Sequence, residues 1–175
     1  MTIEIQTQPK IYIACLAAYN SGKLHGSWID ASQDLDDIQA EIQELLSKSP
    51  IAGAEEWTIH DDEGFGSCSI SESEGLESVC EKAAFIAEHG ELGAELISNF
   101  CGHFEDARIA MEDYYHGEHD SELEYASQLF DEIYLHDIPK SVQYYIDYEA
   151  FCRDLFLDGH YSIKVDHKVH VFSNH

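Results

Sequence analysis

The stretch KIYIACLAAYNSGKLHGSWIDA, residues 10–31, decides the N-terminal fold. Residues 10–18 and 25–31 carry the apolar and β-branched pattern that is typical of strands. The Asn-Ser-Gly sequence at residues 20–22 is typical of a turn between them. The pattern therefore predicts a β-hairpin.

The residues after this hairpin predict one helix and one further strand. With Ser32 as its N-cap, the helix has apolar residues at helical spacing and ends before Pro50. These apolar residues are Leu35, Ile38, Ile42, Leu45 and Leu46. The sequence EEWTIHD, residues 55–61, predicts a strand that returns to the sheet. Residues 1–62 are thus expected to form a small α+β domain.

The rest of the chain predicts mainly helices. The Gly- and Ser-rich residues 63–75 mark a boundary, and a helix from Leu76 is expected to break near Gly90 and Gly93. Further helices are expected over 103–117, 121–135 and 139–159, and the alternating residues 160–172 predict a strand pair that turns at Asp166 and His167. We expect an elongated α+β chain of three small domains: an N-terminal sheet with a helix (1–62), a central helical bundle (63–103), and C-terminal helices with a small sheet (104–175).

The acidic charge is the most unusual property of the sequence. The chain of 175 residues has 35 acidic and 9 basic residues and a net charge of −26. A net charge of about 2–8 in magnitude is enough to keep a small domain soluble, so solubility does not explain this excess. The acidic and basic residues number 11 and 3 in residues 1–62, 8 and 1 in 63–103, and 16 and 5 in 104–175. This even distribution indicates charge on folded surfaces, because an acidic tail would concentrate it in one block.

Several glutamates are expected to form a row along the central helix. The steps from Glu74 to Glu95 are three, four or seven residues, which places such side chains on one stripe of a helix. The row comprises Glu74, Glu77, Glu81, Glu88, Glu91 and Glu95, and the glycines are expected to interrupt it after Glu88. From the residues alone, adaptation to high salt, divalent-cation binding and imitation of a polyanion all remain open explanations of the charge.

The sequence gives little support for catalysis or for a specific metal site. The EF-hand pattern fails at DLDDIQ and at HDDEGF, and no Walker A, G-x-S-x-G, dinucleotide or H-E-x-x-H motif is present. His116 and His119 have a spacing that a metal could use, but HGEHD is expected to be a turn and no matching second pair appears. We therefore expect no enzyme activity, no cofactor and no metal.

The composition also limits the partners and the location. An acidic chain repels a phosphate backbone, so nucleic acid is not an expected partner, and the tyrosines are expected to pack at the edges of the core, Tyr144 and Tyr148 among them. Five widely spaced cysteines suit buried free thiols in a reducing cytoplasm. No leader sequence or membrane span is evident, so a cytoplasmic location is expected.

Three segments together resemble a known family. IYIACLAAYNSGKLHGSWIDA, FEDARIAMEDYYHGEHDSELEYA and LFDEIYLHDIPKSVQYYIDYEAFCRDLFLDG are similar in order to the ArdA antirestriction proteins of mobile genetic elements. The resemblance covers nearly the whole chain, and residues 1–9 look like an additional arm. It implies a homodimeric mimic of bent duplex DNA that occupies the DNA-binding groove of type I restriction–modification enzymes and protects incoming DNA.

The resemblance also assigns roles to residues. The phosphate-mimicking carboxylates would be Glu74, Glu77, Glu81, Glu88, Glu105, Asp106, Glu112, Asp113, Glu118, Asp120, Glu122, Glu124, Asp131 and Glu132. The family's antirestriction motif would lie within residues 129–148, where either target or dimer contacts are made by Leu129, Phe130, Asp137, Ile138, Pro139, Tyr144, Tyr145 and Tyr148.

Two alternatives to this function are an acidic housekeeping domain of a halophile and a metal-binding protein that uses carboxylates with His116 or His119. Crowded carboxylates should also repel one another. We therefore expect their pKa values to be raised in the folded state and the stability to increase with added salt.

Overall fold

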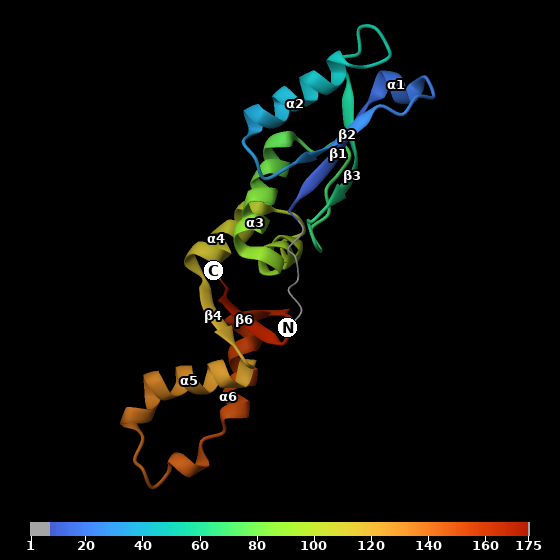
Figure 1. Cartoon of the computed structure of the whole chain (residues 1–175). Coiled ribbons are helices and arrows are strands. Elements are labelled where there is room, and N and C mark those ends of the chain that lie inside the picture. The colour runs from blue at the N-terminus through green and yellow to red at the C-terminus, as the bar shows by residue number, and fades with distance from the viewer. Residues whose placement is uncertain (1–7, 175) are drawn as a thin grey trace, which may run out of the picture. The chain divides into compact units, whose positions relative to one another are not determined.

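The structure is a computed structural model that describes residues 8–174. By its contacts the chain divides into two compact units, the first ending at Phe104 and the second beginning at Glu105 (Figure 1). The expected division into three domains, with boundaries after residues 62 and 103, remains a prediction. The additional arm of residues 1–9 lies outside the described residues except for its last two.

The first unit contains a three-stranded antiparallel sheet in the order β2-β1-β3. Its strands are β1 (Lys10–Cys15), β2 (Gly26–Asp30) and β3 (Trp57–Glu63). The antiparallel pairing of β1 with β2 confirms the predicted hairpin. The first strand is shorter than predicted, because the short helix α1 (Leu16–Asn20) follows it directly. The Ser21 hydroxyl closes this helix by donating a hydrogen bond to the Ala17 carbonyl oxygen.

The helix α2 (Leu35–Ser47) lies along one face of this sheet (Figure 1). Its buried residues repeat at helical spacing, as predicted, and the facing isoleucines of the sheet are equally buried. This core contains Ile11, Ile13, Ile29, Ile38, Ile42, Leu46 and Ile59. The predicted N-cap is wrong: Asp34 is the N-cap, and Ser32 instead donates both its backbone N–H and its hydroxyl to Asp30 Oδ1.

The helix α3 (Leu76–Asn99) follows the loop of residues 64–75 and changes direction at Gly90. Gly90 has φ 62° and ψ −142°, a conformation that is open to glycine and costly for residues with a Cβ. The break predicted there is confirmed, whereas Gly93 lies within the helix. Apolar residues on both arms are buried, among them Val79, Ile86, Leu96 and Ile97.

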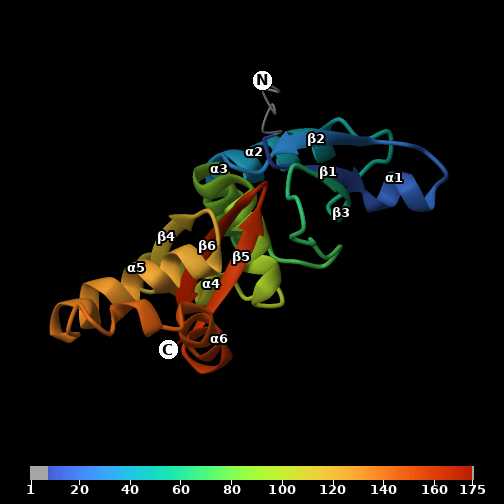
Figure 2. The same ribbon diagram turned by 90° about the horizontal axis from the view of Figure 1, so that it is seen from below.

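The second unit has three antiparallel strands in the order β4-β6-β5, and the helices α5 and α6 contact these strands. The strands are β4 (Tyr115–His119), β5 (His160–Val165) and β6 (Lys168–Ser173), and the helices are α4 (Phe104–Asp113), α5 (Glu122–Tyr134) and α6 (Tyr148–Asp158). Figure 2 shows β5 beside β6. The predicted strand pair is confirmed, and Asp166 makes the turn with φ 54°.

Two predicted elements in the second unit are wrong. Residues 116–120, predicted to be a turn, belong largely to β4, because their backbone groups pair with β6 despite the polar side chains. The helix predicted over 139–159 begins only at Tyr148, where Asp147 is the N-cap and its side chain accepts a hydrogen bond from the Ala150 N–H. Before it come two one-turn 3-10 helices, Leu135–Asp137 and Gln143–Tyr145.

The five cysteines are all free thiols. Cys15 and Cys68 are buried, and Cys80 and Cys152 are partly exposed. Cys101 is exposed, so the expectation of a buried thiol is wrong there. It has φ 55° in the turn that ends α3, and this turn directs it away from the core.

Candidate partner-binding surfaces

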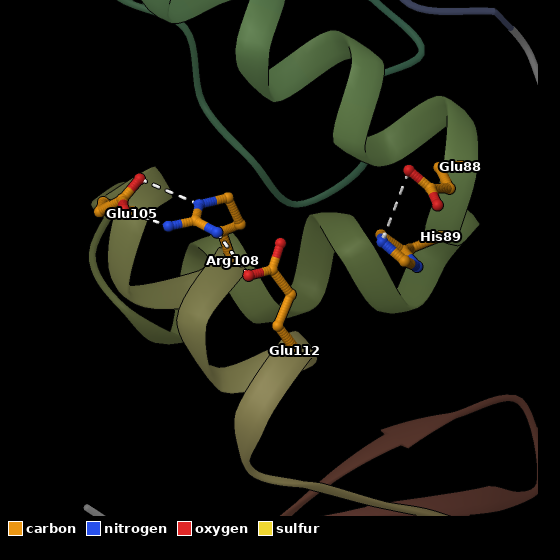
Figure 3. A network of polar contacts seen from close by, with 5 residues as sticks. All are labelled: Glu88, His89, Glu105, Arg108 and Glu112. Atoms are coloured by element: carbon orange, nitrogen blue, oxygen red, sulfur yellow. Dashed lines mark hydrogen bonds and ion pairs between the residues drawn. The ribbon is translucent and has the colours of Figure 1, made fainter.

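The candidate carboxylates fall into two groups, those paired with a cation and those open to solvent. Glu77, Glu81, Asp106, Asp113 and Glu132 are exposed, and within residues 8–174 their side chains make no hydrogen bond or ion pair. Glu88 is also exposed and lies near His89, with 4.0 Å between Oε2 and Nε2 (Figure 3). The unpaired carboxylates come from α3, α4 and α5, so both units present such groups.

Glu74 lies apart from this exposed set. Its side chain is 12% exposed and precedes α3, so it is not part of the predicted helical row. Its Oε1 lies 2.6 Å from Lys82 Nζ and accepts a hydrogen bond from the Ser78 hydroxyl at 2.6 Å. Burial acts to raise the pKa of Glu74, but the bonds from Lys82, Ser78 and the Ser71 N–H outweigh it, and the pKa is lowered. Through these contacts Glu74 connects the loop of residues 64–75 to α3 and stabilises its position.

Arg108 neutralises two of the candidates on α4. Figure 3 shows its guanidinium between Glu105 and Glu112, one turn before and one turn after it. Arg108 Nη1 lies 2.5 Å from Glu112 Oε2, and Nε donates to Glu105 Oε2 at 3.2 Å. Hydrogen bonds from Arg108 lower the pKa of Glu105, and both glutamates raise the pKa of Arg108.

Lys168 has the same role near β4. Its Nζ lies 2.5 Å from Asp120 Oδ1 and 3.8 Å from Glu118 Oε1. The hydrogen bond from Lys168 lowers the pKa of Asp120. Glu124 accepts a hydrogen bond from the Asp120 N–H at 2.7 Å, and Glu122 accepts one from the Ser162 hydroxyl at 2.6 Å. These carboxylates thus help to hold the second unit together as well as carrying charge.

The carboxylate pKa values differ from the expectation of general repulsion. Asp62 has a raised pKa, mainly from burial and then from Asp61. Glu44, Glu74, Glu105 and Asp120 instead have lowered pKa values, since a lysine or arginine contacts each of them. The prediction of raised pKa values is wrong for these four.

The residues of the expected antirestriction motif separate into packed and exposed members. Phe130 contacts Tyr148 and Phe151, with ring centroids 5.5 and 5.1 Å apart, and thereby joins α5 to α6. The Tyr148 hydroxyl donates to Asp131 Oδ1 at 2.6 Å. Leu129 packs against the core formed by Tyr125, Val169 and Val171. These members of the motif stabilise the unit itself.

The other members lie in the segment between α5 and α6. Tyr144 and Tyr145 are 93% and 85% exposed, so the expectation that Tyr144 lies at the edge of the core is wrong. Asp137 and Pro139 are exposed, and the Ile138 carbonyl oxygen accepts a hydrogen bond from Gln143 Nε2 at 3.0 Å. The Gln143 side chain thus stabilises the conformation of this segment. Both tyrosines remain exposed and accessible to a partner.

Four further apolar side chains of the second unit are exposed, and sequence reasoning missed them. They are Ile133, Tyr134, Val142 and Leu157, which are 45–75% exposed. Val142 and Leu157 lie within the helix predicted over 139–159, whereas Ile133 and Tyr134 lie within the helix predicted over 121–135. The proline at 139 and the capping Asp147 were the available signals for a break.

The two histidines considered for metal binding pack on an aromatic ring instead. His116 and His119 have ring centroids 5.8 and 5.0 Å from that of Tyr125. Among residues 8–174, no group of three or more His, Cys, Asp or Glu side chains is arranged to hold a metal ion. Within the same part of the chain, no helix is both long and apolar enough to cross a membrane.

The comparison with known protein families gives one match. The family model described as "Antirestriction protein (ArdA)" matches residues 11–168, which is most of the chain. The protein belongs to the ArdA family of antirestriction proteins. A comparison with curated proteins gave no match.

Proposed function

We propose that the protein is a non-catalytic mimic of duplex DNA that occupies the DNA-binding groove of type I restriction–modification enzymes. It blocks both restriction and modification of incoming mobile-element DNA in the cytoplasm. The observation that carries this proposal is the set of exposed, unpaired carboxylates Glu77, Glu81, Asp106, Asp113 and Glu132, which both units present on helices.

The physical basis is competition for a cationic groove. An enzyme that binds DNA neutralises phosphates with lysine and arginine and releases the counterions around the DNA. A folded array of carboxylates competes for the same cations, and helix geometry sets neighbours on one row about 5–6 Å apart. Because the array is protein, the enzyme cannot cleave or methylate it. Family membership supports the antirestriction activity, and the exposed carboxylates support the mechanism.

The first test is competition between this protein and DNA for a purified type I enzyme. DNA binding should decrease as the protein is added, and the inhibition should weaken at higher salt because the contacts are ionic. DNA binding that is unaffected by a large excess of the protein would exclude the proposal.

An amide scan tests whether the energy is spread over many contacts. Single changes such as Glu81→Gln or Asp106→Asn should barely affect inhibition, whereas the combined change of Glu77, Glu81, Asp106, Asp113 and Glu132 should weaken it strongly. The matched control exchanges Glu for Asp and Asp for Glu at the same five positions, which keeps the charge and should keep the inhibition. Loss of inhibition from a single one of these amide changes would indicate an ordinary interface with a few dominant residues.

We also propose that the protein is a homodimer and that Tyr144 and Tyr145 lie in the contact between the two copies. Two neighbouring tyrosines this exposed are suited to burial against a partner. The double change to Ser should leave the fold intact and produce a monomer in sedimentation experiments. Tyr19→Ser, at an exposed tyrosine of the first unit, is the control and should leave the association unchanged.

A further inference from the structure

The first-unit sheet has a second face, opposite α2, that carries two rows of side chains. On the central strand β1, Tyr12 lies opposite Trp28 of β2 and Asp61 of β3. Lys10 lies opposite Asp30 of β2 and Glu63 of β3. Residues directly opposite one another share a face, and the neighbouring Ile11, Ile13 and Ile29 face the core. The outer face therefore carries the rows Trp28–Tyr12–Asp61 and Asp30–Lys10–Glu63.

In the first row, the partly exposed Trp28 ring packs against the Tyr12 ring. The rings of Tyr12 and Trp28 meet edge to face, with centroids 5.5 Å apart and an interplanar angle of 65°. Gly26 leaves space for this arrangement, since a Cβ there would lie 2.6 Å from the Tyr12 hydroxyl oxygen. Trp28 nevertheless remains 42% exposed. The tyrosine supports the indole and leaves part of it open to solvent.

A cation from the second row, Lys10, already lies near the Trp28 indole. Lys10 Nζ lies 5.7 Å from the centroid of the Trp28 ring, within the range of a cation–π interaction. The same nitrogen lies 3.1 Å from Glu63 Oε2. One lysine faces three carboxylates, those of Asp30, Asp61 and Glu63, so the two rows together carry an excess of two negative charges.

We propose that this outer face binds an arginine side chain of the protein partner, with the guanidinium stacked on Trp28 and the carboxylates of Asp30 and Asp61 as its counter-charges. Asp30 lies two residues along the same strand from Trp28, a distance of about 7 Å. A guanidinium is planar, less strongly hydrated than an ammonium group and able to stack on an aromatic ring. The face therefore favours arginine over lysine.

This inference rests on the proposed function in one respect, the identity of the partner. Enzymes that bind DNA use arginine and lysine to contact phosphates, so an arginine at the surface of the groove is available. The exposed carboxylates imitate phosphates, and Trp28 adds an aromatic contact that a phosphate does not provide. This face would then contribute a larger share of the binding energy than any single carboxylate of the interface.

The first experiment measures arginine binding without the enzyme. The chain contains two tryptophans, Trp28 and Trp57, so 5-fluorotryptophan labelling gives two fluorine NMR signals that Trp57→Phe assigns. A short peptide with two arginines should shift the Trp28 signal at several-fold lower concentration than the same peptide with two lysines. Asp61→Asn should weaken this binding several-fold, and Asp36→Asn, an equal change of charge on α2, should not.

Three results would overturn the proposal. They are an equal response to the arginine and lysine peptides, equal shifts of both tryptophan signals, and a Trp28 signal that moves with protein concentration alone. The last result would assign the face to a second copy of the chain.

The second experiment uses the enzyme and separates this inference from the proposed function. Trp28→Leu should raise the concentration needed for half-inhibition by about tenfold, with circular dichroism unchanged, and Asp61→Asn should raise it less. If the wild-type protein competes with DNA and both variants compete equally well, the inference fails and the proposed function stands. If the wild-type protein does not compete, the proposed function fails, and the peptide experiment alone decides on the arginine site.

Discussion

At the scale of single residues, Lys82 is the cation on which the first unit depends most. Its side chain is 7% exposed and contacts Glu74, whose side chain is 12% exposed. Glu74 in turn accepts hydrogen bonds from Ser78 and from the Ser71 N–H. Removing either charge would leave the other buried and unpaired, which is far more costly than the loss of a surface ion pair.

We predict that Lys82→Met destabilises the protein by about 3–5 kcal/mol. The free energy of unfolding, measured by tryptophan fluorescence in urea, checks this, because both tryptophans belong to the first unit. The matched control is Lys48→Met, which removes an exposed ion pair with Glu44 and should leave the stability nearly unchanged. Equal effects of the two substitutions would show that the Glu74–Lys82 pair has no special role.

The exposure of single side chains could be predicted in part from the sequence. Charged residues are rarely buried unless they are paired, so most candidate carboxylates were placed correctly on the surface. The basic residues that pair with these carboxylates were harder to predict from the sequence. Glu105, Arg108 and Glu112 have helical spacing and could have been paired, but Lys168 and Asp120 meet only because β4 and β6 are neighbours.

At the scale of elements, four histidines gather where β4, α5, β5 and β6 meet. The rings of His116 and His160 have centroids 5.4 Å apart, and Tyr125 contacts His116, His119 and His160. On β6, His170 Nδ1 lies 2.7 Å from the Tyr115 hydroxyl oxygen. Burial, followed by the neighbouring histidine, lowers the pKa of both His116 and His160. The buried Nδ1 of His160 has no hydrogen-bond partner among the described residues.

We predict that the second unit loses stability as the pH falls below about 6.5, the ordinary pKa of histidine. The folded pKa values of His116 and His160 lie below that value, so the unfolded chain binds more protons in this range. The stabilisation is complete above about 6.5 and is lost as the pH falls towards the lower folded values. Thermal unfolding followed by circular dichroism between pH 7.5 and 5.5 measures the effect.

Two substitutions test whether the pH dependence of stability comes from the histidine cluster. His116→Gln should reduce the pH dependence, because it removes one member of the cluster. His167→Gln, at the exposed turn between β5 and β6, is the control and should preserve it. An unfolding temperature of the second unit that does not change over this pH range would contradict the prediction.

Most elements could be predicted from the sequence where the local signals agreed. In α5 the Ser121 cap accepts a hydrogen bond from the Glu124 N–H, and the apolar spacing favours the same helix. In β4 the local signal was misleading, because a short polar sequence resembles a turn and its pairing with β6 joins residues about 50 positions apart. Long-range pairing of this kind leaves little trace in the sequence.

At the scale of the whole molecule, the charge acts on stability as well as on binding. The 35 acidic residues outnumber the 9 basic ones, and like charges on a compact surface repel one another. Arginine and lysine pairs relieve this repulsion locally at Glu44, Glu105 and Asp120. Nine basic residues can pair with only a part of the 35 acidic ones, so much of the repulsion remains.

We predict that the melting temperature rises as sodium chloride is added from 10 mM to 300 mM. Screening reduces the repulsion between exposed carboxylates over a Debye length of about 10 Å at 0.1 M. Each 1 kcal/mol of relieved repulsion should raise the melting temperature by about 2–4 °C. The five-site amide variant should show a smaller rise, and a melting temperature that falls steadily with salt would contradict the prediction.

The small size of the two sheets has a consequence for variants that neutralise charges on their edge strands. In the order β2-β1-β3, and again in β4-β6-β5, two of the three strands are edges that another chain could extend. Edge strands are commonly protected from such pairing by charged side chains, and here β3 carries Asp61, Asp62 and Glu63 while β4 carries Glu118. We expect these charges to oppose aggregation as well, so Asp61→Asn needs a light-scattering measurement before a loss of inhibition is attributed to lost binding.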